Sequence, residues 1–172
     1  MKKKAFTLIE LMVVIAIIGV LLAVISPQVF RQINKGKTAA CEQFYAAVKT
    51  AATSYYSDNL SWPASYSGSG SNYFLVTTGA STWDGPYLDR WQVTNPWGGT
   101  YTWLNNASGV AFNTAGAGER YITISNVPLA DAMRIDLHID GTGGAGSEWV
   151  RYGTSGSNYN VNILVSRDGS VS

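Results

Sequence analysis

The sequence predicts an α+β protein in which a long N-terminal helix packs on a small antiparallel β-sheet. An apolar run from Phe6 to Ile25 is followed by apolar residues at helical spacing as far as Tyr55. From Ser57 onward, short apolar runs alternate with Gly, Ser, Asn and Pro, a pattern typical of strands joined by turns. The 172 residues therefore divide into a basic segment 1–5, a helix 6–56 and one C-terminal domain 57–172.

The composition excludes several functions. Lys and Arg number 12 against 11 Asp and Glu, so the charge offers no footprint for nucleic acid and no such partner is expected. Only 13% of residues are charged while 46% are hydrophobic, which requires an apolar environment for part of the chain. The single cysteine, Cys41, excludes an internal disulfide framework, and with the single His138 it excludes a zinc cluster of familiar spacing.

The first element is the 20-residue run Phe6 to Ile25, in which only Thr7 and Glu10 have polar side chains. A helix of this length spans roughly 30 Å, the hydrocarbon thickness of a bilayer. The lysines of Lys2 to Lys4 precede it, which predicts a cytoplasmic start and an extracytoplasmic remainder. A cleavable secretory signal is the alternative, but the run exceeds the usual length of about 7 to 15 residues and no small-x-small site follows it cleanly.

Glu10 is unusual because a carboxylate within an apolar span costs about 2.5 to 3.5 kcal/mol on insertion scales. One interpretation is that it reaches the lipid headgroups or caps the positive end of its own helix. The other is that it meets a positive charge from another chain. A cut between Ala5 and Phe6 would place a new ammonium four residues before Glu10, on the same helical face. In a stack of parallel helices, Glu10 of one chain could then neutralise the Phe6 ammonium of the next.

Residues 4–19, KAFTLIELMVVIAIIG, resemble the class III prepilin signal of type IV pilins and of the pseudopilins of type II secretion. The resemblance implies that residues 1–5 are a leader peptide. It implies cleavage between Ala5 and Phe6 by a membrane prepilin peptidase, which also N-methylates Phe6. The family usually has Gly before the cut, and Ala5 departs from it, so we expect slower processing.

The same resemblance implies that Glu10 is the assembly glutamate and that Gly19 and Pro27 loosen the helix. Its partners would be other copies in a helical filament, the peptidase and an inner-membrane assembly platform. The chain would be a single-pass protein of the bacterial inner membrane, with a cytoplasmic N-terminus, before assembly. Afterwards it would lie in an extracellular or periplasm-spanning filament.

Beyond Pro27 the helical spacing continues, so one helix is predicted from about Phe6 to Tyr56 with a kink at Pro27. Its apolar stripe is Val29, Ile33, Ala40, Phe44, Val48, Ala51 and Tyr55. Cys41, close to this stripe, is expected to be buried and unreactive. The candidate strands are residues 73–77, 100–104, 110–113, 120–125, 149–152 and 160–165. Residues 128–139 predict a short helix that Gly141 stops.

The segment 83–101 is similar to a loop of the major pseudopilins, in which Gly-x-Tyr-Leu is followed by Asp-Pro-Trp-Gly. Asn95 stands where the family usually has Asp. A set of aromatic residues could form a sugar-binding or adhesive platform: Trp62, Trp83, Trp91, Trp97, Trp103, Tyr87 and Tyr101. We favour a core function for most of them, because each aromatic side chain buries about 150 to 250 Å².

Calcium is the only cofactor that the sequence suggests. Asp136 and Asp140 lie four residues apart on the predicted helix, and with Glu148 they could supply oxygen ligands. We favour a solvated helix face instead, and therefore no metal. His138 has no Ser or Cys nucleophile nearby in the sequence and is expected to be an exposed helix residue, so the chain is not predicted to be an enzyme.

These observations predict a structural subunit of a type IV pilus-type filament, polymerised through its N-terminal helix. Two alternatives stay open: a major pseudopilin of a type II secretion system, and a membrane-tethered monomeric binding module that keeps residues 1–5. We favour the pilus over the pseudopilus because the Gly/Ser-rich, weakly charged sequence after Tyr101 departs from the pseudopilin pattern.

Overall fold

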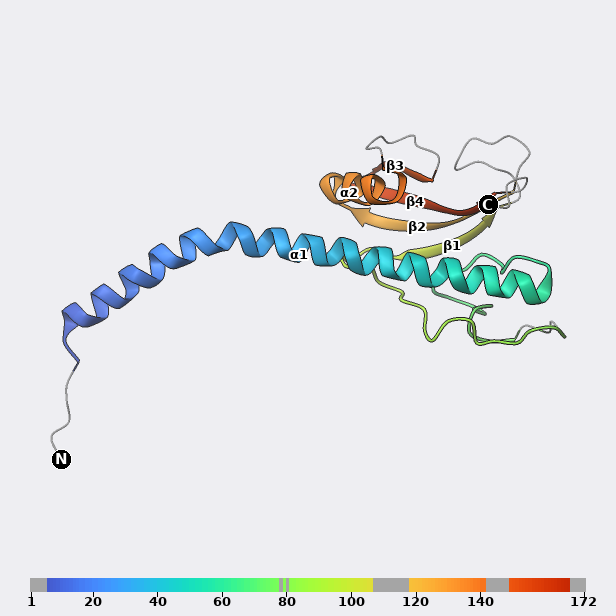
Figure 1. Cartoon of the computed structure of the whole chain (residues 1–172), viewed down its shortest axis with the longest axis horizontal. Helices are drawn as coiled ribbons and strands as arrows, with labels where there is room; N and C mark the ends of the chain where they lie inside the picture. The colour runs from blue at the N-terminus through green and yellow to red at the C-terminus, as the bar shows by residue number, and fades with distance from the viewer. Residues whose placement is uncertain (1–5, 78, 80, 107–117, 142–148, 168–172) are drawn as a thin grey trace, which may run out of the picture. The chain divides into compact units, whose positions relative to one another are not determined.

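The computed structural model describes residues 6–77, 79, 81–106, 118–141 and 149–167 (Figure 1). Its elements are α1 (Leu8–Asn59), β1 (Tyr101–Asn106), β2 (Glu119–Val127), α2 (Leu129–Asp140), β3 (Val150–Ser155) and β4 (Asn158–Arg167). They fall into two compact units, one up to Gly36 and one from Lys37 onward. The predicted α+β class is confirmed.

Helix α1 is continuous through Gly19, Pro27 and Gly36. It begins two residues later and ends three residues later than the sequence predicted. Leu60 ends it by adopting a φ of 51° while its N–H donates to the Tyr56 carbonyl at 2.8 Å. This left-handed residue after the last turn is a common helix C-terminus.

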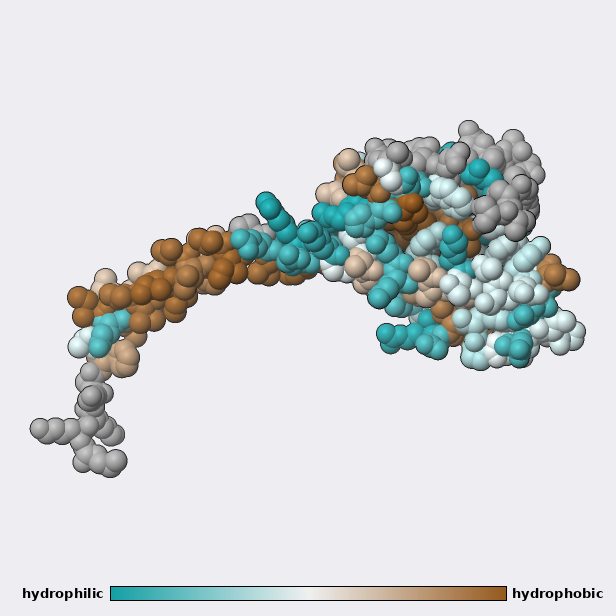
Figure 2. All heavy atoms as spheres, in the orientation of Figure 1, coloured by the Kyte–Doolittle hydropathy of each residue, from teal (hydrophilic) through white to brown (hydrophobic). Residues whose placement is uncertain are grey.

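The first unit contains the apolar part of α1. Residues Leu8–Ile25 are long and apolar enough to cross a membrane, and within this described span no side chain is buried. The hydrophobic side chains cover this part of the helix (Figure 2). Even Ile18, among the least exposed of them, is 49% exposed. Such a surface is compatible with lipid or with other helices around it, and not with water.

In the second unit, α1 buries one face against the sheet. The buried residues recur every three to four positions, as an α-helix on a core requires: Cys41, Phe44, Tyr45, Val48, Ala51, Ala52 and Tyr55. Ala40, which the sequence analysis placed in this stripe, is exposed, and Cys41 lies in the buried row instead. The Phe44 ring contacts Tyr101 of β1 at 4.4 Å between centroids, and the Tyr45 hydroxyl donates to the Leu164 carbonyl of β4 at 2.8 Å.

The sheet is antiparallel, with strand order β1-β2-β4-β3. Its face toward the core carries Trp103, Ile122, Ile124, Val161 and Ile163. Four predicted strands correspond to β1 to β4. The prediction of a strand at 73–77 is wrong, because these residues form a turn in which the N–H groups of Leu75 and Val76 donate to the Asn72 carbonyl. The predicted strand at 110–113 lies outside the described residues.

Helix α2 confirms the prediction for 128–139, and Gly141 ends it with a φ of 72° and an N–H bond to the Leu137 carbonyl at 3.1 Å. Its orientation differs from the expectation of a solvated acidic face. Asp136 is fully buried and Asp131 is 4% exposed. The large apolar residues Leu129 and Met133 lie on the exposed side instead.

Candidate functional site

The start of α1 is held by a reciprocal pair of contacts between Thr7 and Glu10. The Thr7 backbone N–H and hydroxyl both donate to Glu10 Oε2, at 2.9 and 2.7 Å. The Glu10 backbone N–H donates back to the Thr7 hydroxyl oxygen at 3.3 Å. This is a capping box, in which the residue before the helix and the third helical residue satisfy each other's backbone N–H groups.

The capping box confirms the interpretation that Glu10 caps the positive end of its own helix. Thr7 is the capping residue that the sequence analysis missed. The signal was present, because Thr followed three residues later by Glu at the start of an apolar run is the capping-box pattern.

Phe6 and Glu10 border one shallow surface hollow together with Ile9, Val13 and Val14. Phe6 is 80% exposed and precedes the helix. The two residues therefore share a face, as the spacing of four predicted. Ala5 lies outside the described residues. Gly19 lies within α1, where a methyl group in place of its hydrogen would meet no atom within 4 Å.

The second unit contains a tightly bonded loop at residues 95–99. Asn95 is 4% exposed, and its Oδ1 accepts the N–H groups of Trp97 and Gly99 at 2.9 and 3.0 Å. Its Nδ2 donates to the Ser125 carbonyl of β2 at 2.6 Å. The side chain thus acts as both acceptor and donor, which an amide can do and an ionised carboxylate cannot.

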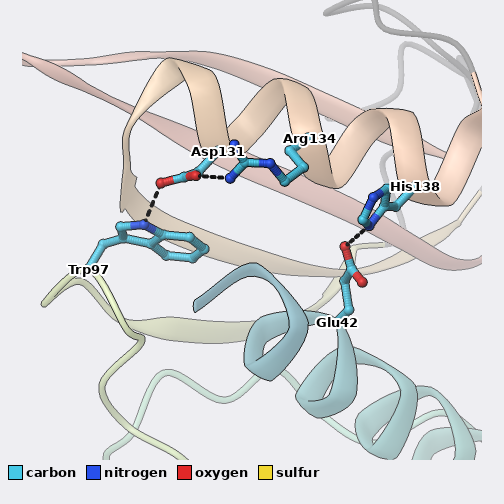
Figure 3. Close-up of polar contacts among 5 residues, drawn as sticks. All are labelled: Glu42, Trp97, Asp131, Arg134 and His138. Atoms are coloured by element: carbon cyan, nitrogen blue, oxygen red, sulfur yellow. Dashed lines mark hydrogen bonds and ion pairs between the residues drawn. The ribbon is translucent and has the colours of Figure 1, made fainter. Parts of the chain in front are cut away.

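The same loop is joined to the first turn of α2 (Figure 3). The Trp97 indole N–H donates to Asp131 Oδ2 at 2.9 Å, and Arg134 pairs with Asp131 Oδ1 at 2.6 Å. Both oxygens of this nearly buried carboxylate are therefore used. A hydrogen bond joins His138 Nδ1 and Glu42 Oε1 of α1 at 2.9 Å. His138 is more than half exposed, as predicted, and its contact is structural.

The segment before that loop closes over the end of α1. The Tyr87 hydroxyl donates to Asp58 Oδ2 at 2.8 Å and accepts the Asp84 N–H at 3.0 Å. The Tyr87 and Tyr55 rings meet edge to face at 5.4 Å. Trp91 and Trp103 are buried, and Trp62, Trp97 and Tyr87 pack on the core. The expectation that most of these aromatic residues fill the core is confirmed.

The calcium candidates do not converge in the described part of the chain. Asp140 Oδ2 accepts the N–H groups of Trp149 and Val150 at 3.3 and 2.9 Å, so this carboxylate fixes the start of β3. Its Oδ1 is buried without a hydrogen-bond partner among the described residues. Asp136 is buried and has interactions of its own, and Glu148 lies outside the described residues. Among those residues no group of three or more His, Cys, Asp or Glu side chains could hold a metal.

The Cys41 thiol is buried among the core side chains of α1. Burial raises its pKa to about 12, because the thiolate would lose its hydration there. The expectation of a buried, unreactive thiol is therefore confirmed.

Comparison with known proteins gives two family matches and several relatives. The family described as "PilW, C-terminal" matches residues 32–117, half of the chain, and the "prokaryotic N-terminal methylation motif" matches residues 1–26. Type II secretion system core protein G of Pseudomonas aeruginosa is 33% identical, over 60% of this chain and 74% of that protein. The type IV major pilin protein PilE1 of Neisseria gonorrhoeae is 34% identical, over 63% of this chain and 56% of that pilin.

Among solved structures, the major type IV pilin PilA1 of Clostridium difficile aligns with 78% of this chain and 97% of its own, at 20% identity and a TM-score of 0.48. An apolar N-terminal helix that continues into an α+β domain places the chain in the class of proteins built from one such helix and one C-terminal domain. Together with the matched methylation motif, the relatives assign the chain to a particular group within that class. It belongs to the family of type IV pilins and type II secretion pseudopilins.

Proposed function

We propose that the chain is a structural subunit of a type IV pilus-type filament. In this proposal the leader 1–5 is removed, Phe6 becomes the methylated N-terminus, and the helices of neighbouring copies pack over Phe6–Ile25. The chain starts as a single-pass inner-membrane protein with a cytoplasmic N-terminus and ends in a filament outside that membrane. Its task is mechanical, and no catalytic step is assigned to it.

The single observation that carries this proposal is the exposed apolar surface of the first unit. Every side chain from Leu8 to Ile25 is exposed, although almost all of them are apolar. Burying such side chains stabilises by about 1.5 to 3 kcal/mol each relative to water. A bilayer can cover this surface before assembly and neighbouring helices can cover it afterwards, so the subunit can leave the lipid without exposing the helix to water.

Glu10 supports the proposal because its carboxylate has acceptor sites beyond those that Thr7 uses. Both contacts with Thr7 are made by Oε2. An ionised carboxylate has two oxygens and about four acceptor sites, so it can also accept an ammonium. The processed Phe6 amine of a neighbouring copy is the group with that charge. The pairing would set the register between copies more than it would add net stability.

The capping box determines how Glu10 should be tested. Glu10→Gln keeps a side-chain oxygen for the Thr7 N–H, since Gln also serves in capping boxes, but it removes the charge. Thr7→Ala removes the two contacts of the Thr7 hydroxyl, which are half of the capping box, and keeps the charge and the backbone N–H contact. We expect Glu10→Gln to stay in the membrane as a processed monomer and to give no filaments, whereas Thr7→Ala assembles. Filament yield is measured by shearing and pelleting, and membrane insertion by fractionation.

Processing needs its own measurement. Intact mass and N-terminal sequencing of sheared material should show a chain that begins at a methylated Phe6. A natural product that keeps residues 1–5 and stays monomeric would contradict the proposal and favour the tethered binding module.

The second candidate is a type II secretion pseudopilus. It is favoured by the loop at 95–99, where Asn95 builds a turn at the position of the motif that resembles the pseudopilin loop. Deleting the gene and measuring both secreted enzymes and surface filaments separates the two. Loss of filaments with normal secretion supports the pilus, and the reverse supports the pseudopilus.

A further inference from the structure

The outer side of α2 carries a row of large apolar side chains. Leu129, Met133 and Leu137 follow one another at intervals of four, so they lie along one line of the helix surface. They are 43%, 46% and 53% exposed. The opposite face buries Ala132 and Ile135 in the core. We call Leu129, Met133 and Leu137 the α2 stripe. These side chains lie outside the core of their own unit.

A second apolar patch lies where α1 ends. Tyr56 is 41% exposed and Leu60 is 80% exposed, and the Leu60 N–H donates to the Tyr56 carbonyl. The Tyr56 ring stacks on Trp62 with centroids 4.6 Å apart. We call Tyr56 and Leu60 the tip patch. Its aromatic ring is held in place by stacking, so it presents a preordered surface.

Both patches belong to the second unit, and their separation can be measured along the axis of α1. His138, next to Leu137 of the stripe, contacts Glu42 of α1 at 2.9 Å (Figure 3). Leu60 follows Glu42 by 18 residues, which at about 1.5 Å per residue is roughly 27 Å along the helix axis. The two patches therefore stand at different heights along α1.

We propose that the α2 stripe of one copy binds the tip patch of a second copy of this chain within the filament. The inference rests on the proposed function. Because two different patches meet, the contact is heterologous and repeats from copy to copy without closing. For parallel helices it requires contacting copies to be offset by roughly 27 Å along the filament axis.

The small size of the stripe identifies the occupant. Three side chains, each about half exposed, bury far less than the about 800 Å² per partner of a stable free complex. The contact can therefore form only between copies that another interface already aligns, where the effective concentration is high. The packed helices of the proposed filament supply that alignment.

A bilayer surface fits the stripe less well. Helices that lie on membranes carry unpaired Lys or Arg on their polar face. In α2 the basic residues are Arg134 and His138, which pair with Asp131 and Glu42. Asp131 thus neutralises the Arg134 charge, and the His138 ring is already hydrogen-bonded to Glu42, so α2 offers anionic headgroups no unpaired Lys or Arg.

Cysteine cross-linking in the full-length chain tests the proposal. Met133→Cys combined with Leu60→Cys should give a ladder of disulfide-linked multimers in oxidised, sheared filaments, and only monomers in detergent. Native Cys41 is buried and should stay silent. Each single variant should give no ladder. Met133→Cys combined with Val93→Cys is the matched control, since Val93 is 49% exposed but belongs to neither patch.

Each other outcome overturns the proposal in a recognisable way. Filaments without a ladder in the Met133/Leu60 pair would refute this contact and leave the filament function standing. A disulfide-linked dimer from Met133→Cys alone would show that the α2 stripe contacts the same stripe of another copy. If doxyl lipids quench the fluorescence of bimane attached to that variant, the stripe contacts the membrane. Failure of the wild-type chain to form filaments would remove both this inference and the proposed function.

Discussion

Replacing Asn95 with Asp tests whether the loop at 95–99 needs the amide group. The two bonds that Oδ1 accepts from Trp97 and Gly99 can survive, and an ionised acceptor strengthens each of them. The donor bond to the Ser125 carbonyl, 2.6 Å long in the native protein, is lost, and two oxygens face each other there. A buried acceptor left without its donor costs about 1 to 3 kcal/mol, of which the strengthened bonds offset part.

We therefore expect Asn95→Asp to lower the free energy of unfolding by about 1 to 2 kcal/mol at neutral pH, and to lower Tm by about 3 to 8 °C. A protonated Asp could donate to the Ser125 carbonyl, so folding should raise the pKa of this carboxyl above its ordinary value. A raised acid pKa means stability that is present at low pH and lost as pH rises. The stability difference between Asn95→Asp and the wild type should thus become smaller as the pH is lowered.

Thermal unfolding followed by circular dichroism, from about pH 4 to pH 8, measures both effects. Asn95→Ala is the control, because it loses all three bonds and adds no titratable group. Its deficit should be larger, and its difference from the wild type should not depend on pH. An Asn95→Asp variant as stable as the wild type at neutral pH would refute the claim that the donor bond matters.

Three further predictions concern the second unit. Gly99→Ala should cost about 3 kcal/mol, since the added methyl group would overlap the Ser125 carbonyl, whereas Gly153→Ala, with open space around it, should unfold like the wild type in the same melts. Alkali should lower Tm as pH rises from 9 toward 12, because the unfolded Cys41 thiol ionises near 9.0 and the buried thiol only near 12. Cys41→Ala should reduce that pH dependence without abolishing it, because burial also raises the pKa of Tyr45 and Tyr101 above the ordinary value. Removing calcium with a chelator should leave Tm unchanged, because calcium takes about six to eight oxygen ligands and the described candidates do not converge; a drop in Tm would establish the metal site.

The class of fold followed from periodicity alone, because helices and half-buried strands bury residues at fixed intervals. The exact buried row did not follow. Ala40 and Cys41 are adjacent and both are small and apolar, so sequence spacing could not decide which faces the core. The turn at 73–77 was mistaken for a strand because it is a short apolar run whose central residue, Phe74, is buried by loop packing, which the sequence pattern cannot distinguish from burial in a sheet.

Helix α2 shows that amphipathicity alone does not predict which face of a helix is buried. Its sequence places apolar residues on nearly all sides, so the pattern does not say which of them are covered. Burial of Asp131 is made possible by two partners, Trp97 and Arg134, and the first of them lies 34 residues away in the chain. Tertiary hydrogen bonds of that kind leave no local signal, and the exposed α2 stripe follows from them.

At the N-terminal site, the sequence spacing predicted which residues share a face. It did not predict that Thr7 of the same chain also binds the Glu10 carboxylate. Phe6 and Glu10 share a face, as expected, yet the carboxylate already binds Thr7 of its own chain. Glu10 therefore does not need a neighbour in order to be tolerated at the end of an apolar helix. An arriving ammonium must either use the remaining acceptor sites or displace the Thr7 hydroxyl. If displacement occurs, Thr7→Ala should assemble at least as well as the wild type, because the cost of breaking that bond disappears. If assembly of Thr7→Ala instead fails while Glu10→Gln succeeds, helix capping and not charge pairing is what the filament requires of Glu10.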